Sequence, residues 1–183
     1  QNDTDEDRIV YLNVENVEVR ISSLSNAAMK WFDYTEDPSD MPWDSELKIQ
    51  LDEFPDITFK YTPHEIIATT SNGNTILITG MPIWNAYFTD LTGDGFPEIC
   101  SEVSFGSGII DNHVIIFDYA NGVSYKLADR GYHDYFLRMN DTDGCLYVDK
   151  KLYKSDEFVS SGKLVFKDGC IQLEGFTHLT LDD

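Results

Sequence analysis

Hydrophobic and polar residues alternate with a period near two along most of the chain, which is the pattern of half-buried β-strands. The segments with this pattern cover residues 9–21, 47–51, 57–61, 66–70, 75–79, 83–88, 98–105, 113–119, 123–127, 132–139, 145–149, 163–167, 170–174 and 176–181. Several neighbouring segments enclose a turn sequence such as Asn72-Gly73, which predicts β-hairpins. The chain is therefore predicted to be mainly β, an antiparallel meander that forms either a sandwich or a few propeller-like blades.

The first of these segments, residues 9–21, changes phase in its middle. Val10, Leu12 and Val14 alternate with polar residues before Asn16, and Val17, Val19 and Ile21 do so after it. Such a slip indicates one long bent strand or two strands separated by a bulge.

A different spacing follows. Leu24, Ala27, Ala28, Trp31 and Phe32 are spaced as on one face of a helix, which predicts one short helix near residues 24–33. The next stretch contains Pro38, Pro42 and several acidic residues, so residues 34–46 are expected to form a surface loop, with a possible subdivision of the domain near residues 36–46. Within it, Trp43 either pins the loop to the core or, if exposed, contacts a ligand.

The segment from Asp90 to Glu98 has the spacing of a calcium loop. Side-chain oxygens stand at loop positions 1, 3, 5 and 9, in Asp90, Thr92, Asp94 and Glu98. Gly95 at position 6 allows a sharp turn that aims the Phe96 carbonyl inward at position 7. These residues predict a Ca²⁺ site. The alternative is a tight turn in which the glycines only supply positive φ angles.

The flanks of the loop read as strands rather than helices, and position 12, where an EF-hand needs Glu, is Ser101. A strand-loop-strand site with this spacing resembles the calcium loops of FG-GAP repeats, which occur in integrin-type β-propellers and many secreted bacterial proteins. The sequence departs from the usual FG-GAP pattern at Thr92 and Glu98, where Asp or Asn is commoner. One loop of this kind does not support a complete propeller of repeated blades.

A wider part of the chain, about residues 54–135, resembles an extracytoplasmic domain of clostridial and related gut bacteria. The resemblance rests on residues 79–84, the calcium loop, residues 103–111 and residues 117–122. Such domains occur alone or at the C-terminus of membrane proteins similar to β-lactam-sensing metallopeptidases. The resemblance implies an extracytoplasmic location, on the cell surface or secreted. The zinc motif of the peptidases is missing, so their activity does not carry over.

The chain has 33 acidic and 13 basic residues, a net charge of −20. This charge repels phosphate backbones and anionic lipid surfaces, which argues against nucleic-acid partners. No apolar run is long enough to span a membrane, so direct membrane insertion is not expected either. Residues 1–7 are expected to be a disordered acidic tether, as would remain after a secretion signal or lipoprotein anchor, and residues 8–183 a single mainly β domain.

The sequence contains no convincing catalytic constellation. Gly106-Ser107-Gly108 lacks the frame of a nucleophile elbow, and His64, His113, His133 and His178 are expected to be scattered at the surface or at strand ends. Asp141-Thr142-Asp143-Gly144 is expected to be a hairpin turn rather than a second ion site. Of the three cysteines, only Cys145 and Cys170 are plausible disulfide partners.

These features together predict a non-catalytic extracytoplasmic domain that acts as an interaction or sensory module for an unknown protein or glycan. One alternative is a carbohydrate-binding module or carbohydrate-active enzyme. In that alternative sugars would stack on exposed aromatic residues, with Trp43, Trp84, Tyr87, Tyr132 and Tyr135 as candidates. The other alternative is an architectural spacer without a ligand.

Overall fold

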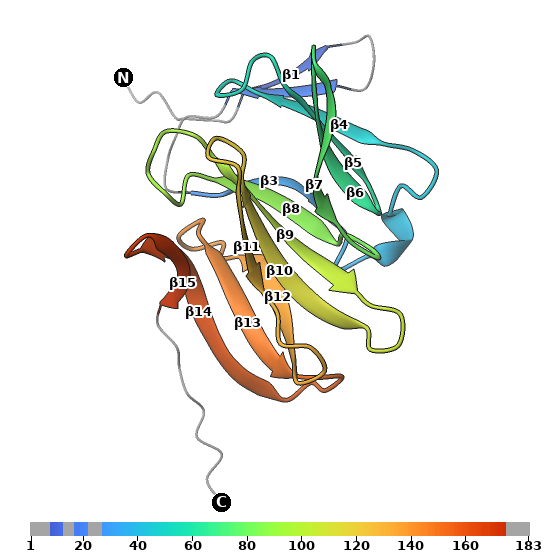
Figure 1. Ribbon diagram of the computed structural model, residues 1–183, viewed down its shortest axis with the longest axis vertical. Helices are drawn as coiled ribbons and strands as arrows, with labels where there is room; N and C mark the ends of the chain where they lie inside the picture. Colours follow the sequence, from blue (N-terminus) through green and yellow to red (C-terminus); the bar gives the residue numbers. More distant parts are fainter. Residues whose placement is uncertain (1–7, 13–16, 22–26, 175–183) are drawn as a thin grey trace, which may run out of the picture.

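The computed structural model describes residues 8–12, 17–21 and 27–174. Their strands form a six-stranded N-terminal sheet, a five-stranded central sheet and a four-stranded C-terminal sheet (Figure 1). The N-terminal sheet contains β1 (Arg8–Leu12), β2 (Val17–Ile21), β4 (Leu47–Leu51), β5 (Thr58–Thr62), β6 (Glu65–Thr70) and β7 (Gly73–Thr79). The central sheet contains β3 (Met29–Asp33), β8 (Asn85–Thr89), β9 (Glu98–Phe105), β10 (Asp111–Asp118) and β11 (Val123–Leu127). The C-terminal sheet contains β12 (His133–Met139), β13 (Leu146–Leu152), β14 (Phe158–Lys167) and β15 (Cys170–Glu174).

Each sheet is built around a run of consecutive antiparallel strands, β4–β7, β8–β11 and β12–β15. Consecutive strands pair because short turns return the chain directly to its neighbour. Among the described strands, two pairings depart from this pattern. β2 pairs with β4 in parallel, and β3 pairs antiparallel with the distant β8. The predicted mainly β meander is confirmed.

The central sheet separates two hydrophobic cores. One core packs the N-terminal sheet against one face of the central sheet, with Phe59 and Tyr61 meeting Phe88 and Val103. The other core packs the opposite face against the C-terminal sheet, where Cys100 and Ile116 meet Leu137 and Val148. Figure 1 shows the yellow-green central sheet between the blue-green and the orange-red layers. A strand in the middle of this layer can therefore be buried on both faces, as β9 is from Glu98 to Ser104, whereas the edge strand β11 has no buried residue.

The predicted helix near residues 24–33 is wrong where the structure describes it, because Met29–Asp33 is strand β3. The pairing of β3 with β8 shifts register between Lys30 and Phe32, and the consecutive residues Trp31 and Phe32 are both buried in the same core. A bulge of this kind breaks the period of two and imitates helical spacing. Residues 24–26 lie outside the described residues.

The phase slip near Asn16 also has a different cause from the one expected. β1 and β2 pair with each other antiparallel, from Arg8 opposite Ile21 to Leu12 opposite Val17. The chain therefore reverses direction between them, and neither a continuous bent strand nor a bulge describes this segment. The predicted tether at residues 1–7 and the predicted strand at residues 176–181 lie outside the described residues.

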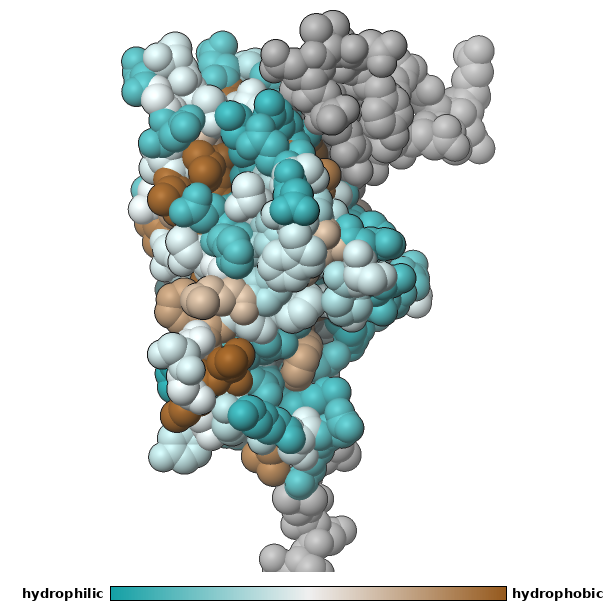
Figure 2. Space-filling model, turned by 90° about the vertical axis from the view of Figure 1, so that its right-hand side faces the viewer, coloured by the Kyte–Doolittle hydropathy of each residue, from teal (hydrophilic) through white to brown (hydrophobic). Residues whose placement is uncertain are grey.

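The acidic segment of residues 36–46 is an ordered loop that contains the short 3₁₀ helix η1 (Pro38–Asp40). Figure 2 faces the side of the molecule on which η1 lies in Figure 1, and hydrophilic residues cover most of it while hydrophobic residues form separate patches. Among the described residues, no helix is long and apolar enough to cross a membrane.

Candidate metal centre

The predicted calcium loop connects the two innermost strands of the molecule. β8 ends at Thr89 and β9 begins at Glu98, and every residue of β8 is buried. The chain turns between them with positive φ at Gly93 (74°) and Gly95 (91°). These angles suit glycine because it has no Cβ. The turn thus has the glycine geometry that either interpretation of the sequence requires.

Asp90 organises the turn from its first position. Its Oδ1 accepts hydrogen bonds from the N–H groups of Gly93 (2.8 Å) and Asp94 (3.2 Å), and its Oδ2 accepts one from the N–H of Gly95 (3.0 Å). Three backbone donors therefore hold the carboxylate in place at the mouth of the loop.

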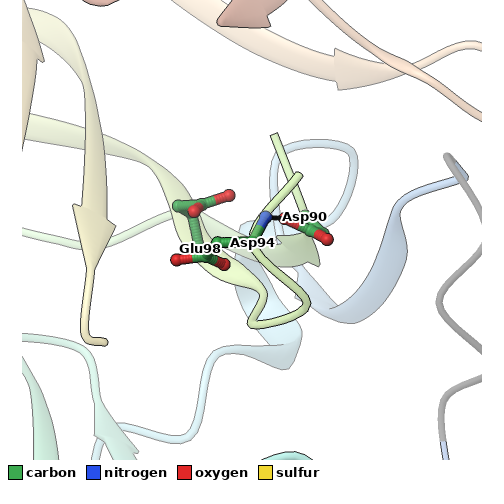
Figure 3. Close-up of side chains that lie close together, drawn as sticks. All are labelled: Asp90, Asp94 and Glu98. Atoms are coloured by element: carbon green, nitrogen blue, oxygen red, sulfur yellow. Dashed lines mark hydrogen bonds between the residues drawn. The ribbon is translucent and has the colours of Figure 1, made fainter. Parts of the chain in front are cut away.

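Asp90, Asp94 and Glu98 lie together at this turn (Figure 3), and each offers a carboxylate oxygen within 4.8 Å of the other two. Glu98 is fully buried, whereas Asp94 is exposed. The cluster therefore has an inner carboxylate at the start of β9 and an outer one that faces solvent.

The carboxylate of Glu98 is held by the loop itself. Its Oε2 accepts a hydrogen bond from the N–H of Leu91 (2.6 Å), and its Oε1 accepts one from the hydroxyl of Thr92 (2.8 Å). Burial nevertheless raises the pKa of Glu98, these donors lower it, and the nearby Asp118 carboxylate raises it further, with a net increase. The ionised form of Glu98 is thus less stable here than in water.

Asp118 and Asn121 join the site from the β10–β11 hairpin, and the sequence analysis missed both. Phe117 pairs with Ile99, so continuing the register by one residue places the buried Asp118 opposite Glu98. The side-chain amide of Asn121 donates hydrogen bonds to Asp118 Oδ2 (2.8 Å) and Asp94 Oδ2 (3.1 Å). Asn121 therefore links the hairpin to the loop. The cross-strand register was the one signal that could have found Asp118.

The five predicted ligand residues have different places in the structure. Asp90, Asp94 and Glu98 converge, whereas the Thr92 hydroxyl donates to Glu98. The Phe96 side chain turns away and packs on Phe54, with ring centroids 5.5 Å apart. Phe96 thus anchors the loop to the connection between β4 and β5, and only its carbonyl remains available as a ligand.

The second Asp-Gly turn is held differently. Asp143 accepts hydrogen bonds from the Cys145 N–H (2.9 Å) and the Tyr147 hydroxyl (2.8 Å), and Lys163 Nζ lies 3.9 Å from it. The Cys145 N–H and then the Tyr147 hydroxyl lower the pKa of Asp143. Neighbouring groups of the protein therefore stabilise this negative charge. The Cys145–Cys170 disulfide considered from the sequence is not formed, since none of Cys100, Cys145 and Cys170 takes part in a disulfide bond.

His113 was predicted to lie at the surface or at a strand end. This prediction is wrong, because His113 is fully buried on β10. Its Nε2 lies 2.7 Å from Oδ1 of the buried Asp111, and Arg130 Nε lies 3.2 Å from the same oxygen. Asp111 Oδ2 also accepts a hydrogen bond from the Gly131 N–H (2.9 Å). The group ties the loop after β9 to the chain before β12.

The five aromatic residues proposed for sugar stacking differ in exposure. Tyr87 and Tyr135 are buried, and Trp84 is half-buried with its indole N–H donating to the Ser104 hydroxyl (2.8 Å). Trp43 and Tyr132 are 57% and 72% exposed. Of the two roles considered for Trp43, pinning the loop to the core is therefore excluded.

Comparison of the chain with protein-family models, curated proteins and solved structures finds no match.

Proposed function

We propose that the loop from Asp90 to Glu98 binds one Ca²⁺ ion that stabilises a non-catalytic, extracytoplasmic interaction or sensory domain of a bacterial surface. The observation that carries the proposal is the convergence of three carboxylates within 4.8 Å, of which Glu98 is buried. Asp118 adds a fourth acidic group next to Glu98. The hydrogen-bond donors to these four carboxyl groups are all neutral, so a cation would relieve the repulsion among them.

The donor set favours calcium among the common metal ions. Every candidate ligand is an oxygen, whereas zinc sites usually contain Cys or His. Calcium also accepts irregular arrangements of six to eight oxygens, while magnesium demands a near-ideal octahedron. In the proposed site, Asp90, Asp94 and Glu98 supply carboxylate oxygens. Thr92 and the Phe96 carbonyl supply further ligands after a small adjustment of the loop.

The expected affinity agrees with an extracytoplasmic location. Calcium modules outside the cell commonly have dissociation constants of about 10⁻⁴ to 10⁻³ M. Thr92 replaces an acidic ligand and Glu98 gives up part of its hydrogen-bonding capacity to the loop, so we expect the weak half of that range. Such a site would be filled only where calcium is abundant. The proposed location also rests on the resemblance of residues 54–135 to extracytoplasmic domains.

Calorimetric titration of chelator-treated protein with calcium tests the ion site. We expect one ion per chain, weaker binding of magnesium, and loss of the signal in the Asp90→Asn/Asp94→Asn double variant, which keeps the shape of both side chains. Equal heats for wild type and double variant would refute the proposal.

Antibody labelling of the source organism tests the location. The domain should be labelled on intact cells. Labelling that appears only after permeabilisation would place it inside the cell and contradict the proposal.

A further inference from the structure

We propose that the hollow around Trp43 binds an arginine side chain presented by a basic segment of a partner protein. The hollow has a volume of about 410 Å³ and is lined by Trp43, Asp44, Glu46, Thr62, Pro63 and His64, together with Ser45. The inference rests on the proposed role as an interaction module but not on the calcium loop, since the two sites share no residue.

The Trp43 side chain is displayed by a loop that is itself well anchored. Met41, two residues earlier, is only 4% exposed, and its carbonyl accepts a hydrogen bond from the Trp43 N–H (2.9 Å). The Ser45 N–H donates to the Pro42 carbonyl (3.4 Å). The backbone on both sides of Trp43 is therefore fixed while the indole stays exposed. A preorganised aromatic ring loses little conformational freedom when it binds, which is typical of residues that dominate interfaces.

The opposite wall of the hollow is also held in place. The Pro63 carbonyl accepts a hydrogen bond from the Ile83 N–H (2.7 Å), and the His64 carbonyl accepts one from the Gly80 N–H (3.0 Å). The His64 ring lies 6.1 Å from the Trp43 ring and is tilted by 52°. The two rings therefore lie close together at an angle, and more than half of the Trp43 side chain stays open to solvent and to a ligand.

The charge around the hollow selects a cation. Residues 34–46 contain Glu36, Asp37, Asp40, Asp44 and Glu46 and no Lys or Arg, in a chain of net charge −20. Lys48, just beyond the loop, pairs with Glu46 at 3.1 Å. A cation gains from stacking on the indole and from the negative field, whereas a neutral sugar gains only from stacking.

Arginine fits this combination better than lysine. Its flat guanidinium group can stack on a Trp face and donate two parallel hydrogen bonds to one carboxylate at the same time. Asp44 follows Trp43 in the chain and also lines the hollow, so we assign its carboxylate as the acceptor. A lysine ammonium could reach the same groups but would lose more hydration in doing so.

The test is a titration of ¹⁵N-labelled protein with a short peptide containing two arginines, followed by the Trp43 indole N–H signal in NMR spectra. A citrulline peptide of the same shape without the charge is the matched probe. We expect the arginine peptide to bind with a dissociation constant of about 1 mM and the citrulline peptide at least about fivefold more weakly.

Variants locate the binding. Trp43→Ala and Asp44→Asn should each weaken arginine binding at least about fivefold, whereas Tyr132→Ala, which removes the other strongly exposed aromatic residue, should leave it unchanged. Because the Trp43→Ala variant loses the reporter signal, its binding is followed by the shifts of the backbone N–H groups of Asp44 and Glu46.

Each other outcome overturns the proposal. Equal binding of the arginine and citrulline peptides would remove the role of charge, and no shift with any peptide would remove the site. A shift of the Trp43 signal by chitin or cellulose oligosaccharides but not by the arginine peptide would make the hollow a sugar site. Repeating the titration in calcium and in chelator separates this result from the fate of the calcium loop, because arginine binding should be the same in both.

Discussion

Glu98 and Glu102 lie four residues apart on β9, on the same face of the strand, and both are buried. Their surroundings differ. Glu98 stands at the end of the strand, where two further carboxylates of the loop reach it and one of them is exposed. Glu102 stands inside the molecule, where the central sheet meets the C-terminal sheet, and is 3% exposed.

The interior site satisfies Glu102 with neutral partners. Its Oε2 accepts a hydrogen bond from the Leu137 N–H (2.9 Å), and its Oε1 accepts one from the Asn112 amide (3.0 Å). Asn85 continues the network, accepting from the Glu102 N–H (2.8 Å) and donating to the Leu137 carbonyl (3.1 Å). Burial raises the pKa of Glu102 to about 8, despite the lowering effect of the Leu137 N–H. Glu102 is therefore mostly protonated at neutral pH.

The comparison shows two ways to tolerate a buried carboxyl group. At Glu102 a proton removes the charge, because the site is closed and its partners are neutral. Glu98 is also buried, but it lies next to Asp90 and to Asp94, which is exposed to solvent. A cation can therefore reach the site and balance the charge of Glu98 instead. Burial alone therefore does not make a carboxyl group a candidate metal ligand. The group must also be accessible to an ion and lie close to other carboxylates.

The largest effect should come from the pH dependence of Glu102. Its folded pKa lies above its ordinary value of 4.5, so its contribution to stability is complete below about pH 4.5 and is lost as pH rises through about 8. Wild type should lose up to about 1.4 kcal/mol per pH unit in this window relative to Glu102→Gln, which cannot ionise. Urea unfolding of both proteins between about pH 5 and about pH 9 measures the difference. A constant difference would mean that Glu102 is charged throughout.

Glu98 should show a pH dependence of stability that calcium abolishes. Its folded pKa is also raised, so in chelator the stability it contributes at low pH is lost as pH rises through that pKa. Calcium holds the ionised form, so the same rise in pH should cost no stability when calcium is present, and binding should release protons. Thermal melts across pH, with and without calcium, check this, and Glu98→Gln should abolish the difference. If calcium does not change the pH profile of wild type, Glu98 is not a ligand.

Asp94 should carry most of the calcium-dependent stabilisation. About 10 mM calcium over a dissociation constant of about 10⁻³ M stabilises the folded state by roughly 1.4 kcal/mol. For a domain of this size the melting temperature rises by about 3 to 6 °C. Asp94→Ala should remove this shift, as measured by differential scanning fluorimetry. Coincident wild-type curves in calcium and in chelator would leave the segment as a turn without an ion.

Asp143→Ala is the smallest change and the matched control. Its carboxylate is already stabilised by the Cys145 N–H, the Tyr147 hydroxyl and Lys163, so it has no need of an ion. Because Asp143 is exposed to solvent, we expect its loss to change stability little and to leave the calcium shift as in wild type. A reduced shift in this variant would show that calcium acts away from the loop.

The elements that could be predicted from the sequence were those whose signals are local. The hairpin at Asn72-Gly73 and the strand at residues 98–105 depend on neighbouring residues, and both are confirmed, although β9 is buried on both faces rather than half-buried. The helix prediction failed at Trp31 and Phe32, because the bulge that buries both depends on pairing with β8, which lies more than fifty residues away. The stacking of three sheets on two cores likewise depends on contacts between distant strands.

The residues of the candidate metal site also fall into those that the local sequence predicts and those that depend on the pairing of distant strands. Asp90, Asp94 and Glu98 were found because one turn brings them together at fixed spacing. Asp118 was missed because only the register between β9 and β10 places it opposite Glu98, and Asn121 was missed with it. The sequence could not show whether Trp43 is exposed either, because its exposure depends on Met41 being the residue of this loop that is buried.

Because β9 is buried on both faces, its two glutamates also affect the register of the strand, independently of ion binding and protonation. Glu98 and Glu102 share one face with Cys100, while Ile99 and Val103 lie in the core on the other face. A shift of the β9 register by one residue would place both acidic side chains in the aromatic core beside Phe59 and Phe88. Their present hydrogen-bond partners would then be left unsatisfied. Mispaired versions of the central sheet are therefore strongly penalised during folding. The acidic residues help to select the one alignment in which the chain can assemble.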